Sequence, residues 1–254
     1  MKLDILYEDN DIIVCHKAPG VSSQQERSYD PDMVSMLMNH FAKNGVKNPY
    51  VGVVHRLDKP VAGVIIYGKT KAATLALSKQ ITERNCTKKY KAILCGDVQK
   101  LFTSPNVTFE DNICTLNDYL LRDAKTNTSM VVDINDKKYA SNKEVKKSSL
   151  KFCLEKTIKL PSDNPFYNEN SPFDNVLSLV DIELLTGRHH QIRVQFSNAG
   201  FPLWGDLKYS TFSKDCGQRK GVALCSYSLT INHPSTKKEM TFSVIPSNSI
   251  FKYI

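Results

Sequence analysis

The sequence predicts an α+β fold. Short apolar runs rich in β-branched residues recur along the chain, and clusters of Asp, Asn and Gly separate them, as expected for strands joined by turns. Two segments in the first third repeat apolar residues every three or four positions, which is typical of amphipathic helices. No internal repeat or linker divides the chain, so we expect one domain over residues 1–254.

The elements of the first third are predicted by local signals. Residues 3–17 form two apolar runs around an acidic cluster, which predicts a strand, a turn and a second strand. Asp30 and Pro31 are expected to open a helix that Gly45 ends, with its apolar face formed by Val34, Leu37, Met38 and Phe41. Thr70 is expected to cap a second helix that ends near Asn85.

The remaining two thirds predict mostly strands. In residues 88–95, Tyr90 shares one face with apolar neighbours, while lysines alternate on the other face. Residues 188–200 suggest a short helix that Gly200 stops, and Trp204 is expected to anchor a loop in the core. Further strands are expected at 113–121, 129–134, 176–185, 223–234 and 241–244, with a solvated turn or hairpin tip at 136–149 and a surface loop at 161–175.

Composition limits the class of protein. The chain has 34 basic and 26 acidic residues, a formal charge of +8, which favours a polyanionic partner. Its seven cysteines form no C-x-x-C pair, so reduced and mostly buried thiols are expected. The N-terminus has no apolar signal core, and no apolar stretch is long enough to span a membrane. We therefore expect a soluble, cytoplasmic protein.

Asp58 is the first candidate for chemistry. It lies between Arg56 and Lys59 in a charged cluster that runs into an apolar, β-branched segment, so the sequence predicts a loop feeding a buried strand. One alternative is that Asp58 only caps a turn before Pro60. A kinase catalytic loop is excluded, because Leu57 separates the Arg from the Asp and no Gly-rich phosphate loop is present.

A second polar cluster begins the helix expected at 188–200. Its first turn would carry Arg188, His189 and His190. Adjacent helical side chains point about 100° apart, so the two histidines are poorly spaced for a metal, whereas His189 and Arg193 share a face that suits an anion. A buried arginine needs a carboxylate, and Asp58 is the obvious one to test.

The ordered set of these motifs resembles the RluA-type family of pseudouridine synthases. A single His-Arg-Leu-Asp would be a weak signal, but the set is specific and spans most of the chain. The matching pieces are Leu6–Asp9, Lys17–Gly20, Val54–Lys59 with Gly63, Lys89–Tyr90, Thr186–Arg188, His190–Val194, Gly200–Pro202, Gly205–Asp206 and His233–Pro234.

The resemblance implies an enzyme that isomerises uridines in structured ribosomal or transfer RNA to pseudouridine without a cofactor or metal. It implies a mixed, mainly antiparallel central sheet flanked by helices and loops, with an active-site cleft across it. Asp58 corresponds to the catalytic aspartate, Tyr90 to the tyrosine that packs on the target base, and Arg193 to the arginine that pairs with the aspartate. Leu184 or Leu185 would wall the base pocket.

The same resemblance implies which residues meet the RNA. The candidates for RNA binding are His55, Arg56, Lys59, Arg188, His189, His190 and Gln191. We expect a monomer with no membrane partner and no separate N-terminal RNA-binding domain. Two other functions compete: a catalytically inactive RNA-binding or ribosome assembly factor of the same fold, and a glycosylase that extrudes the nucleotide but releases the base.

Overall fold

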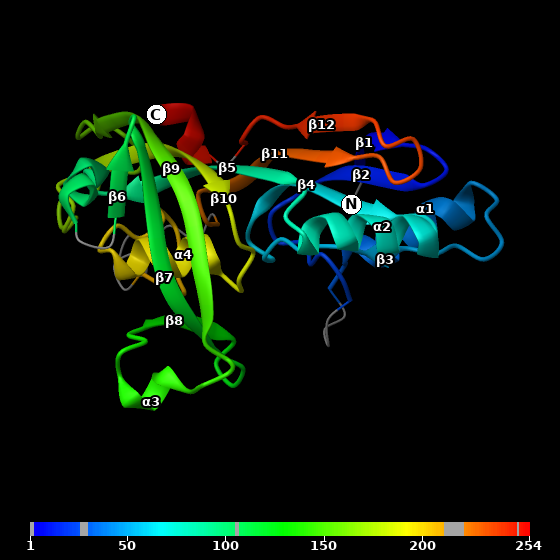
Figure 1. Ribbon diagram of the computed structural model, residues 1–254. Coiled ribbons are helices and arrows are strands. Elements are labelled where there is room, and N and C mark those ends of the chain that lie inside the picture. Colours follow the sequence, from blue (N-terminus) through cyan, green and yellow to red (C-terminus); the bar gives the residue numbers. More distant parts are fainter. Residues whose placement is uncertain (1–2, 26–29, 105–106, 211–220, 248) are drawn as a thin grey trace. The chain divides into compact units, whose positions relative to one another are not determined.

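The computed structural model describes residues 3–25, 30–104, 107–210, 221–247 and 249–254. The chain forms two compact units (Figure 1). Unit 1 contains Met1–Lys89 and Cys225–Pro246, and unit 2 contains Tyr90–Leu224 and Ser247–Ile254. Each unit therefore combines segments that are distant in the sequence, and a single cut in the chain cannot separate them. The prediction of a single catalytic domain stays a prediction.

Unit 1 is a sheet with two helices. Its strands run in the order β1-β2-β4-β11, with β12 added to β11 and β3 added to β4. These pairs are antiparallel except β4 with β11, which is parallel. The elements are β1 (Asp4–Glu8), β2 (Ile12–Lys17), α1 (Met33–Lys43), β3 (Gly52–Val53), β4 (Ala62–Gly68), α2 (Lys71–Thr82), most of β11 (Leu224–Asn232) and β12 (Glu239–Ser243).

Strand β4 is the centre of unit 1. All seven of its residues are buried, which confirms the buried strand predicted after the charged cluster. Two of its side chains, Val64 and Ile66, pack with residues of β2, β11 and β12 and with Leu77 of α2 in one apolar cluster. A strand covered on both faces is a rigid base for the loop that precedes it.

The two helices of unit 1 occur where the sequence predicts them, with one difference. The Thr70 hydroxyl caps α2 by accepting a hydrogen bond from the Ala73 amide at 3.1 Å, as expected. Helix α1 is capped by Asp32 instead of Asp30, because the Asp32 carboxylate accepts the Ser35 amide at 3.0 Å. The prediction that Asp30 opens this helix was therefore wrong by two residues.

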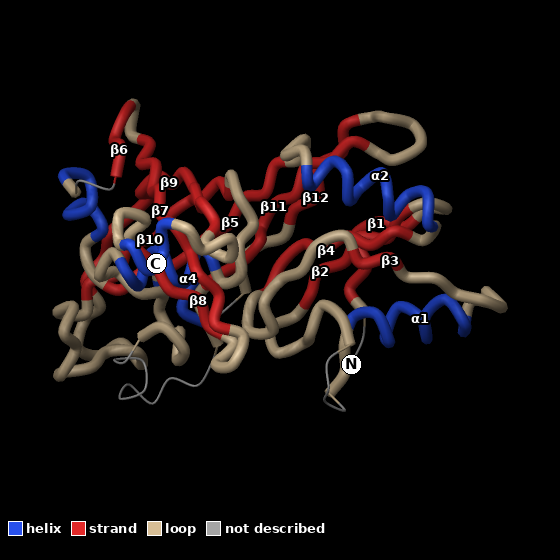
Figure 2. Tube along the Cα trace, turned by 60° about the horizontal axis from the view of Figure 1, so that its bottom comes forward, coloured by secondary structure: helices blue, strands red, loops and turns tan. Residues whose placement is uncertain are grey.

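Unit 2 is a second, antiparallel assembly of strands (Figure 2). Its strands run in the order β5-β10-β9-β7-β6, with β8 added to β7. The pairs β10–β9, β9–β7, β7–β6 and β7–β8 are antiparallel. The elements are β5 (Thr87–Cys95), η1 (Val98–Thr103), β6 (Val107–Glu110), β7 (Ile113–Asp123), β8 (Thr128–Val132), α3 (Lys137–Ala140), β9 (Lys146–Lys159), β10 (Val176–Leu184), α4 (Gln191–Asn198) and η3 (Ser249–Tyr253). The α+β class and the mainly antiparallel sheet are confirmed.

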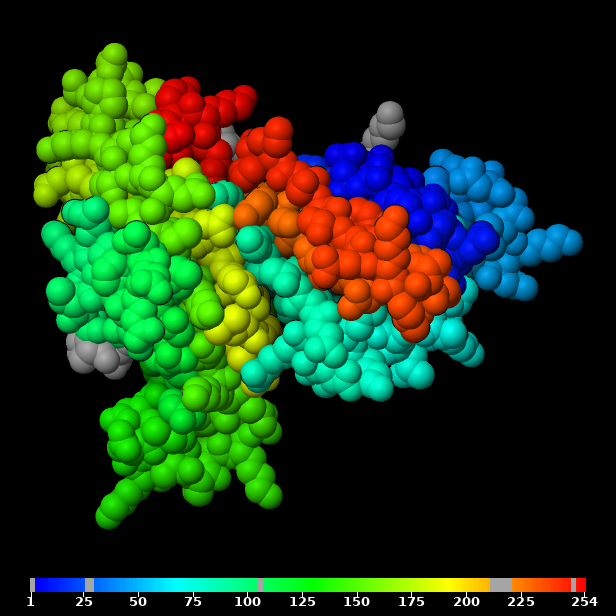
Figure 3. Space-filling model, turned by 45° about the horizontal axis from the view of Figure 1, so that its top comes forward, coloured from blue at the N-terminus to red at the C-terminus, as the bar shows by residue number. Residues whose placement is uncertain are grey.

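Trp204 anchors the core of unit 2, as predicted. Its side chain is only 5% exposed and packs with Ile93, Leu177 and Ala223. Its backbone pairs with Ile93 and Ala223 at 2.9 Å each. Helix α3, between β8 and β9, buries no side chain (Figures 1 and 3). The solvated tip predicted at 136–149 is therefore confirmed for 136–145, but residues 146–149 belong to β9, in which Ser148 is fully buried.

Six cysteines lie in the described residues, and all six are free thiols. Cys15, Cys114 and Cys225 are buried. The expectation that most are buried is therefore met by half of them, and Cys216 lies outside the described residues. No helix in the described residues is both long and apolar enough to cross a membrane.

Candidate functional site

The loop that precedes β4 presents Asp58. Residues 54–58 have no regular secondary structure, and Asp58 is partly buried. Its backbone carbonyl accepts the amide of Val61 at 2.9 Å, which closes a turn just before the strand begins. The turn interpretation therefore holds for the Asp58 backbone. Asp58 therefore lies in a defined turn directly before β4.

A buried cation stabilises this loop through hydrogen bonds to its backbone. Lys17, at the end of β2, is fully buried, and its ammonium donates hydrogen bonds to the carbonyls of Val21 at 2.7 Å and Lys59 at 3.2 Å. The Lys59 carbonyl also accepts the Gly20 amide at 2.7 Å. The residue that follows Asp58 is thus tied to two points of the preceding chain. In the sequence, Lys17 is part of a family motif, but no role was predicted for it.

The charge of Lys17 matters as much as its hydrogen bonds. Burial lowers its pKa to about 8, while the nearby Asp58 carboxylate acts in the opposite direction and raises it. At neutral pH Lys17 is therefore mainly protonated. Lys17 thus places a buried positive charge close to the Asp58 carboxylate.

His55 and Arg56 have different surroundings although they are adjacent. The His55 ring accepts a hydrogen bond from the Ile66 amide of β4 at 3.2 Å through Nε2. Burial, and then the positive charge of Lys88, lower its pKa to about 3, so the ring is neutral. Arg56 is exposed. His55 thus fixes the loop to the strand, and Arg56 is the member of the pair that is available to a ligand.

Lys59 contributes its side chain to an ion pair at the edge of the same loop. Its ammonium lies 2.7 Å from the Asp30 carboxylate, and both side chains are substantially exposed. Such a pair is worth at most about 1 kcal/mol, so the Lys59 ammonium can exchange Asp30 for a more strongly bound anion at low cost.

In unit 2, Tyr90 lies on β5 and is 7% exposed. It shares a buried face with Ala92 and Leu94, as predicted from the alternation. Lys91 points to the other side, where it lies 2.8 Å from Asp181 and also pairs with Glu155. The Tyr90 ring is therefore set in apolar surroundings by the pleat of the strand.

Arg193 is buried on α4, and Asp206 binds it. The Arg193 Nε and Nη2 atoms donate to the two Asp206 oxygens at 2.7 and 2.8 Å, a bidentate pair in which Asp206 is fully buried. Asp206 also accepts the amides of Lys208 and Tyr209 at 3.0 and 3.3 Å. The need for a carboxylate is confirmed, but in the sequence Asp206 was only part of a family motif and was not predicted to be the partner of Arg193. The predicted pair with Asp58 would join the two units and stays a prediction.

Helix α4 begins later than expected. It spans Gln191–Asn198, and His190 precedes it in the left-handed conformation with φ of 53°. Arg188, His189 and His190 therefore precede the helix, and the prediction that they form its first turn was wrong. A left-handed residue breaks the helical path, which is why periodicity alone placed the start too early. Gly200 follows the helix with φ of 88°, so the predicted stop is confirmed.

Gln191 holds this loop together from inside. It is 2% exposed, and its side-chain oxygen accepts the Thr186 hydroxyl at 2.8 Å and the Arg188 amide at 3.0 Å. Its amide nitrogen donates to the Ser149 carbonyl at 3.1 Å. Gln191 therefore stabilises the loop from within. The Arg188 side chain, in contrast, is exposed and donates to the Lys147 carbonyl.

The two histidines stack on each other beside a tyrosine. The His189 and His190 ring centroids lie 3.7 Å apart. His189 Nδ1 is 3.0 Å from the Ser129 hydroxyl, and His190 Nδ1 is 2.8 Å from the Tyr209 hydroxyl. The Tyr209 ring also lies 5.2 Å from the Arg193 guanidinium carbon. No group of three or more His, Cys, Asp or Glu suited to a metal occurs in the described residues.

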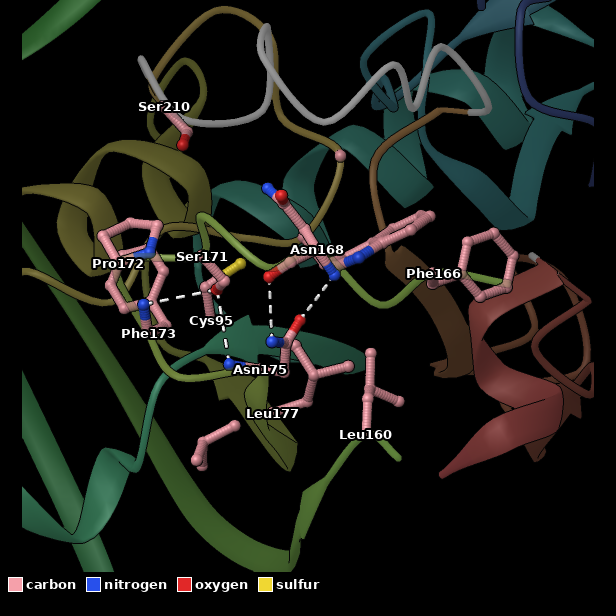
Figure 4. Close-up of a pocket in the computed structure, with 13 residues that line it drawn as sticks. Cys95, Leu160, Phe166, Asn168, Ser171, Pro172, Phe173, Asn175, Leu177 and Ser210 are labelled. Atoms are coloured by element: carbon pink, nitrogen blue, oxygen red, sulfur yellow. Dashed lines mark hydrogen bonds between the residues drawn. The ribbon is translucent and has the colours of Figure 1, made fainter. Parts of the chain in front are cut away.

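The cavity in unit 2 that Figure 4 shows has a different character. None of the thirteen described residues that line it carries a formal charge, and Trp204, Phe166 and Phe173 contribute aromatic rings. Asn175 is engaged with the backbone of Asn168 at 2.8 and 2.9 Å. The volume of about 40 Å³ holds about three water molecules, too few to make room for a nucleobase. The cavity is a packing feature of the 161–175 loop.

Comparisons with known proteins decide the family. A family model described as RNA pseudouridylate synthase matches residues 11–198, most of the chain. The chain belongs to this family. Its RluA-type character agrees with relatives named ribosomal large subunit pseudouridine synthase C and D. The protein is accordingly an isomerase that acts on uridine in RNA.

Individual relatives resemble the pseudouridine synthase over almost its whole length. It is 30% identical over 252 residues to Uncharacterized RNA pseudouridine synthase YlyB of Bacillus subtilis (strain 168), covering 95% of this chain and 68% of that protein. It is 27% identical to Ribosomal large subunit pseudouridine synthase C of Buchnera aphidicola subsp. Schizaphis graminum (strain Sg), covering 98% of this chain and 68% of the relative. The structure of Human RNA Pseudouridylate Synthase Domain Containing 1 has a TM-score of 0.69 at 21% identity, covering 96% of this chain and 83% of that one, a similarity of fold.

Proposed function

We propose that this pseudouridine synthase isomerises selected uridines in structured RNA and that Asp58 is its catalytic aspartate. Two relatives are named for the large ribosomal subunit, so ribosomal RNA is the first substrate to test and transfer RNA the second. The observation that carries the assignment is the placement of Asp58 on a fixed turn, close to the buried Lys17 ammonium.

The reaction needs no redox partner. The bond between N1 of uracil and C1′ breaks, a bond between C5 and C1′ forms, the C5 hydrogen leaves to solvent and N1 gains a proton. An anionic group close to the sugar serves each route that we consider, whether it attacks C1′ or the ring, or removes the proton at C2′. The chemistry thus calls for one ionised, oriented carboxylate.

The other two predicted catalytic residues are assigned from the family motifs. Tyr90 packs against the target base, which suits its apolar surroundings on β5. Arg193 pairs with Asp58 and shares its guanidinium with the Asp206 carboxylate. Leu184 or Leu185, both partly buried where β10 ends, walls the base pocket.

RNA binding is assigned to cationic and histidine side chains of these loops that are exposed or partly exposed. Extruding a stacked uridine costs a few kcal/mol, and phosphate contacts made by a chain of charge +8 offset that cost. Arg56, Lys59 and Arg188 contact the RNA directly together with His189 and His190. Arg56 fills the stack that the extruded base leaves.

The test follows tritium released from C5-labelled uridine in RNA, with free uracil measured in parallel. We expect release without uracil, no release from Asp58→Asn, and normal release from the control Asp4→Asn, an exposed carboxylate of unit 1. Uracil release would indicate a glycosylase, and RNA binding without tritium loss in the wild type would indicate a binding factor. Full activity of Asp58→Asn would refute the assignment.

A test of Arg56 separates extrusion from chemistry. Arg56→Ala is expected to slow turnover on folded RNA more than on an unstructured oligonucleotide that contains the same uridine, because only the folded RNA has a stack to fill. Equal rates for wild type and variant on folded RNA would dismiss the role.

A further inference from the structure

The residue before Asp58 is held by a buried serine from a distant part of the chain. Ser23 is 4% exposed, and its hydroxyl donates to the Leu57 carbonyl at 2.7 Å and accepts from the Leu57 amide at 2.9 Å. The Leu57 carbonyl belongs to the peptide group that continues into Asp58. One hydroxyl therefore fixes the peptide planes on both sides of Leu57, and with them the direction in which the chain enters Asp58.

A tyrosine on the central strand holds the serine in turn. The Tyr67 hydroxyl donates to the Ser23 carbonyl at 2.6 Å, and the Tyr67 side chain is fully buried on β4. Burial raises the Tyr67 pKa far above its ordinary value, so this hydroxyl keeps its proton at any working pH. The result is a continuous connection from β4 through Tyr67 and Ser23 to the loop that carries Asp58.

The two sides of Asp58 are held by independent groups. Ser23 holds Leu57 before it, and Lys17 and Gly20 hold the Lys59 carbonyl after it. With both flanking residues fixed, Asp58 has little backbone freedom left, and its carboxylate direction depends on these anchors.

We propose that Ser23 is a positioning residue for Asp58 and that Tyr67 acts through it. This inference rests on the proposed catalytic role of Asp58. A reacting group must be held within about 0.5 Å of its productive position, and a displacement of about 1 Å costs on the order of 100-fold in rate. Ser23 supplies this restraint without contacting the RNA.

Four variants test the proposal on the full chain. Ser23→Ala removes both bonds to Leu57, and Tyr67→Phe removes only the bond to Ser23. The double variant combines them. The matched control is Ser22→Ala, because Ser22 is adjacent, is 3% exposed, and its hydroxyl has no hydrogen-bond partner among the described residues.

The measurements are the single-turnover rate constant at saturating RNA, the Kd for RNA, and the melting temperature. We expect Ser23→Ala to lower the rate about 10- to 100-fold with Kd within about threefold, and Ser22→Ala to keep the wild-type rate. Tyr67→Phe should lower the rate by a smaller factor. That factor should disappear in the Ser23→Ala background, because Tyr67 then has nothing to position.

Each other outcome overturns the inference. Equal rates for Ser23→Ala and Ser22→Ala, multiplicative effects of Ser23→Ala and Tyr67→Phe, or losses that appear only in Kd would all show that Ser23 does not position the carboxylate. Measuring Asp58→Asn in the same series distinguishes a failure of the positioning role from a failure of the catalytic assignment. If Asp58→Asn is inactive while Ser23→Ala is not impaired, the positioning role fails and the catalytic assignment stands; if Asp58→Asn is active, the proposed function itself fails.

Discussion

Removing the charge of Asp206 should destabilise unit 2 strongly. Asp206→Asn keeps the shape of the side chain but places a neutral amide against the Arg193 guanidinium, which is 5% exposed. One of the two charge-assisted bonds is lost, and the buried guanidinium loses the negative charge of Asp206. Breaking a buried ion pair in this way costs about 3–5 kcal/mol. That is a large part of a stability that is typically about 5–15 kcal/mol.

The chain provides its own probe for this experiment. It has a single tryptophan, Trp204, which lies in the core of unit 2 two residues before Asp206. Tryptophan fluorescence followed in urea therefore reports the unfolding of unit 2. We expect the midpoint for Asp206→Asn to fall by about 1–2 M, because a chain of this length has a slope of about 3 kcal/mol/M, the upper end of the usual range in urea.

The control is a carboxylate of the same unit in a more exposed pair. Glu155→Gln removes one partner of Lys91, which keeps Asp181 at 2.8 Å. Its cost should stay below about 1 kcal/mol. If Asp206→Asn costs no more than Glu155→Gln, the buried pair is not a principal support of α4, and the reasoning from burial is refuted.

Two further predictions concern unit 1 and its backbone. The Lys17 pKa of about 8 lies below the 10.5 of the unfolded chain, so the unfolded state binds the extra proton between these values and stability rises with pH across this window. The unfolding free energy of wild type relative to Lys17→Met should therefore increase by about 3 kcal/mol from pH 7 to pH 11, and a constant difference in urea titrations would contradict it. Gly63→Ala should cost more than about 2 kcal/mol, because Gly63 has φ of 136° and an added Cβ would meet the Ser226 carbonyl oxygen at 2.3 Å. Gly200→Ala, also at positive φ but with open space around it, should cost clearly less, and equal melting temperatures would show that the close approach is not limiting.

Elements with a strong local signal were predictable from the sequence. The cap at Thr70, the stop at Gly200 and the apolar run of β4 each depend on a few adjacent residues, and each is confirmed. Strand β9 was missed although it is the longest strand, at 14 residues. Ser148, Leu150 and Phe152 alternate on its buried face, but the lysines and serines between them made the segment resemble a solvated turn. The alternation of buried and exposed residues was present in the sequence, but the charged side chains between the buried positions obscured it.

Contacts between distant segments were not predictable in the same way. The sequence shows that Arg193 needs a carboxylate, but it does not show that the chain turns back after α4 to bring Asp206 to it. Ser23 carries no signal at all, because a serine that bonds a backbone amide and carbonyl leaves no spacing or periodicity in the sequence. Such groups become visible only when both ends of the bond are located.

This difference explains how the motifs relate to the chemistry. The motifs identify the groups that would react. Asp58 lies on a loop and Arg193 near the start of α4, and other residues impose the conformation of both. In unit 1 the Asp58 turn is fixed by Ser23 and Lys17, and in unit 2 Arg193 is fixed and neutralised by Asp206. Arg193 thus has a carboxylate within its own unit, and Asp58 has a cation within its own. Each of the two groups is therefore held by partners within its own unit, which is why a motif can identify a reactive side chain without revealing what positions it.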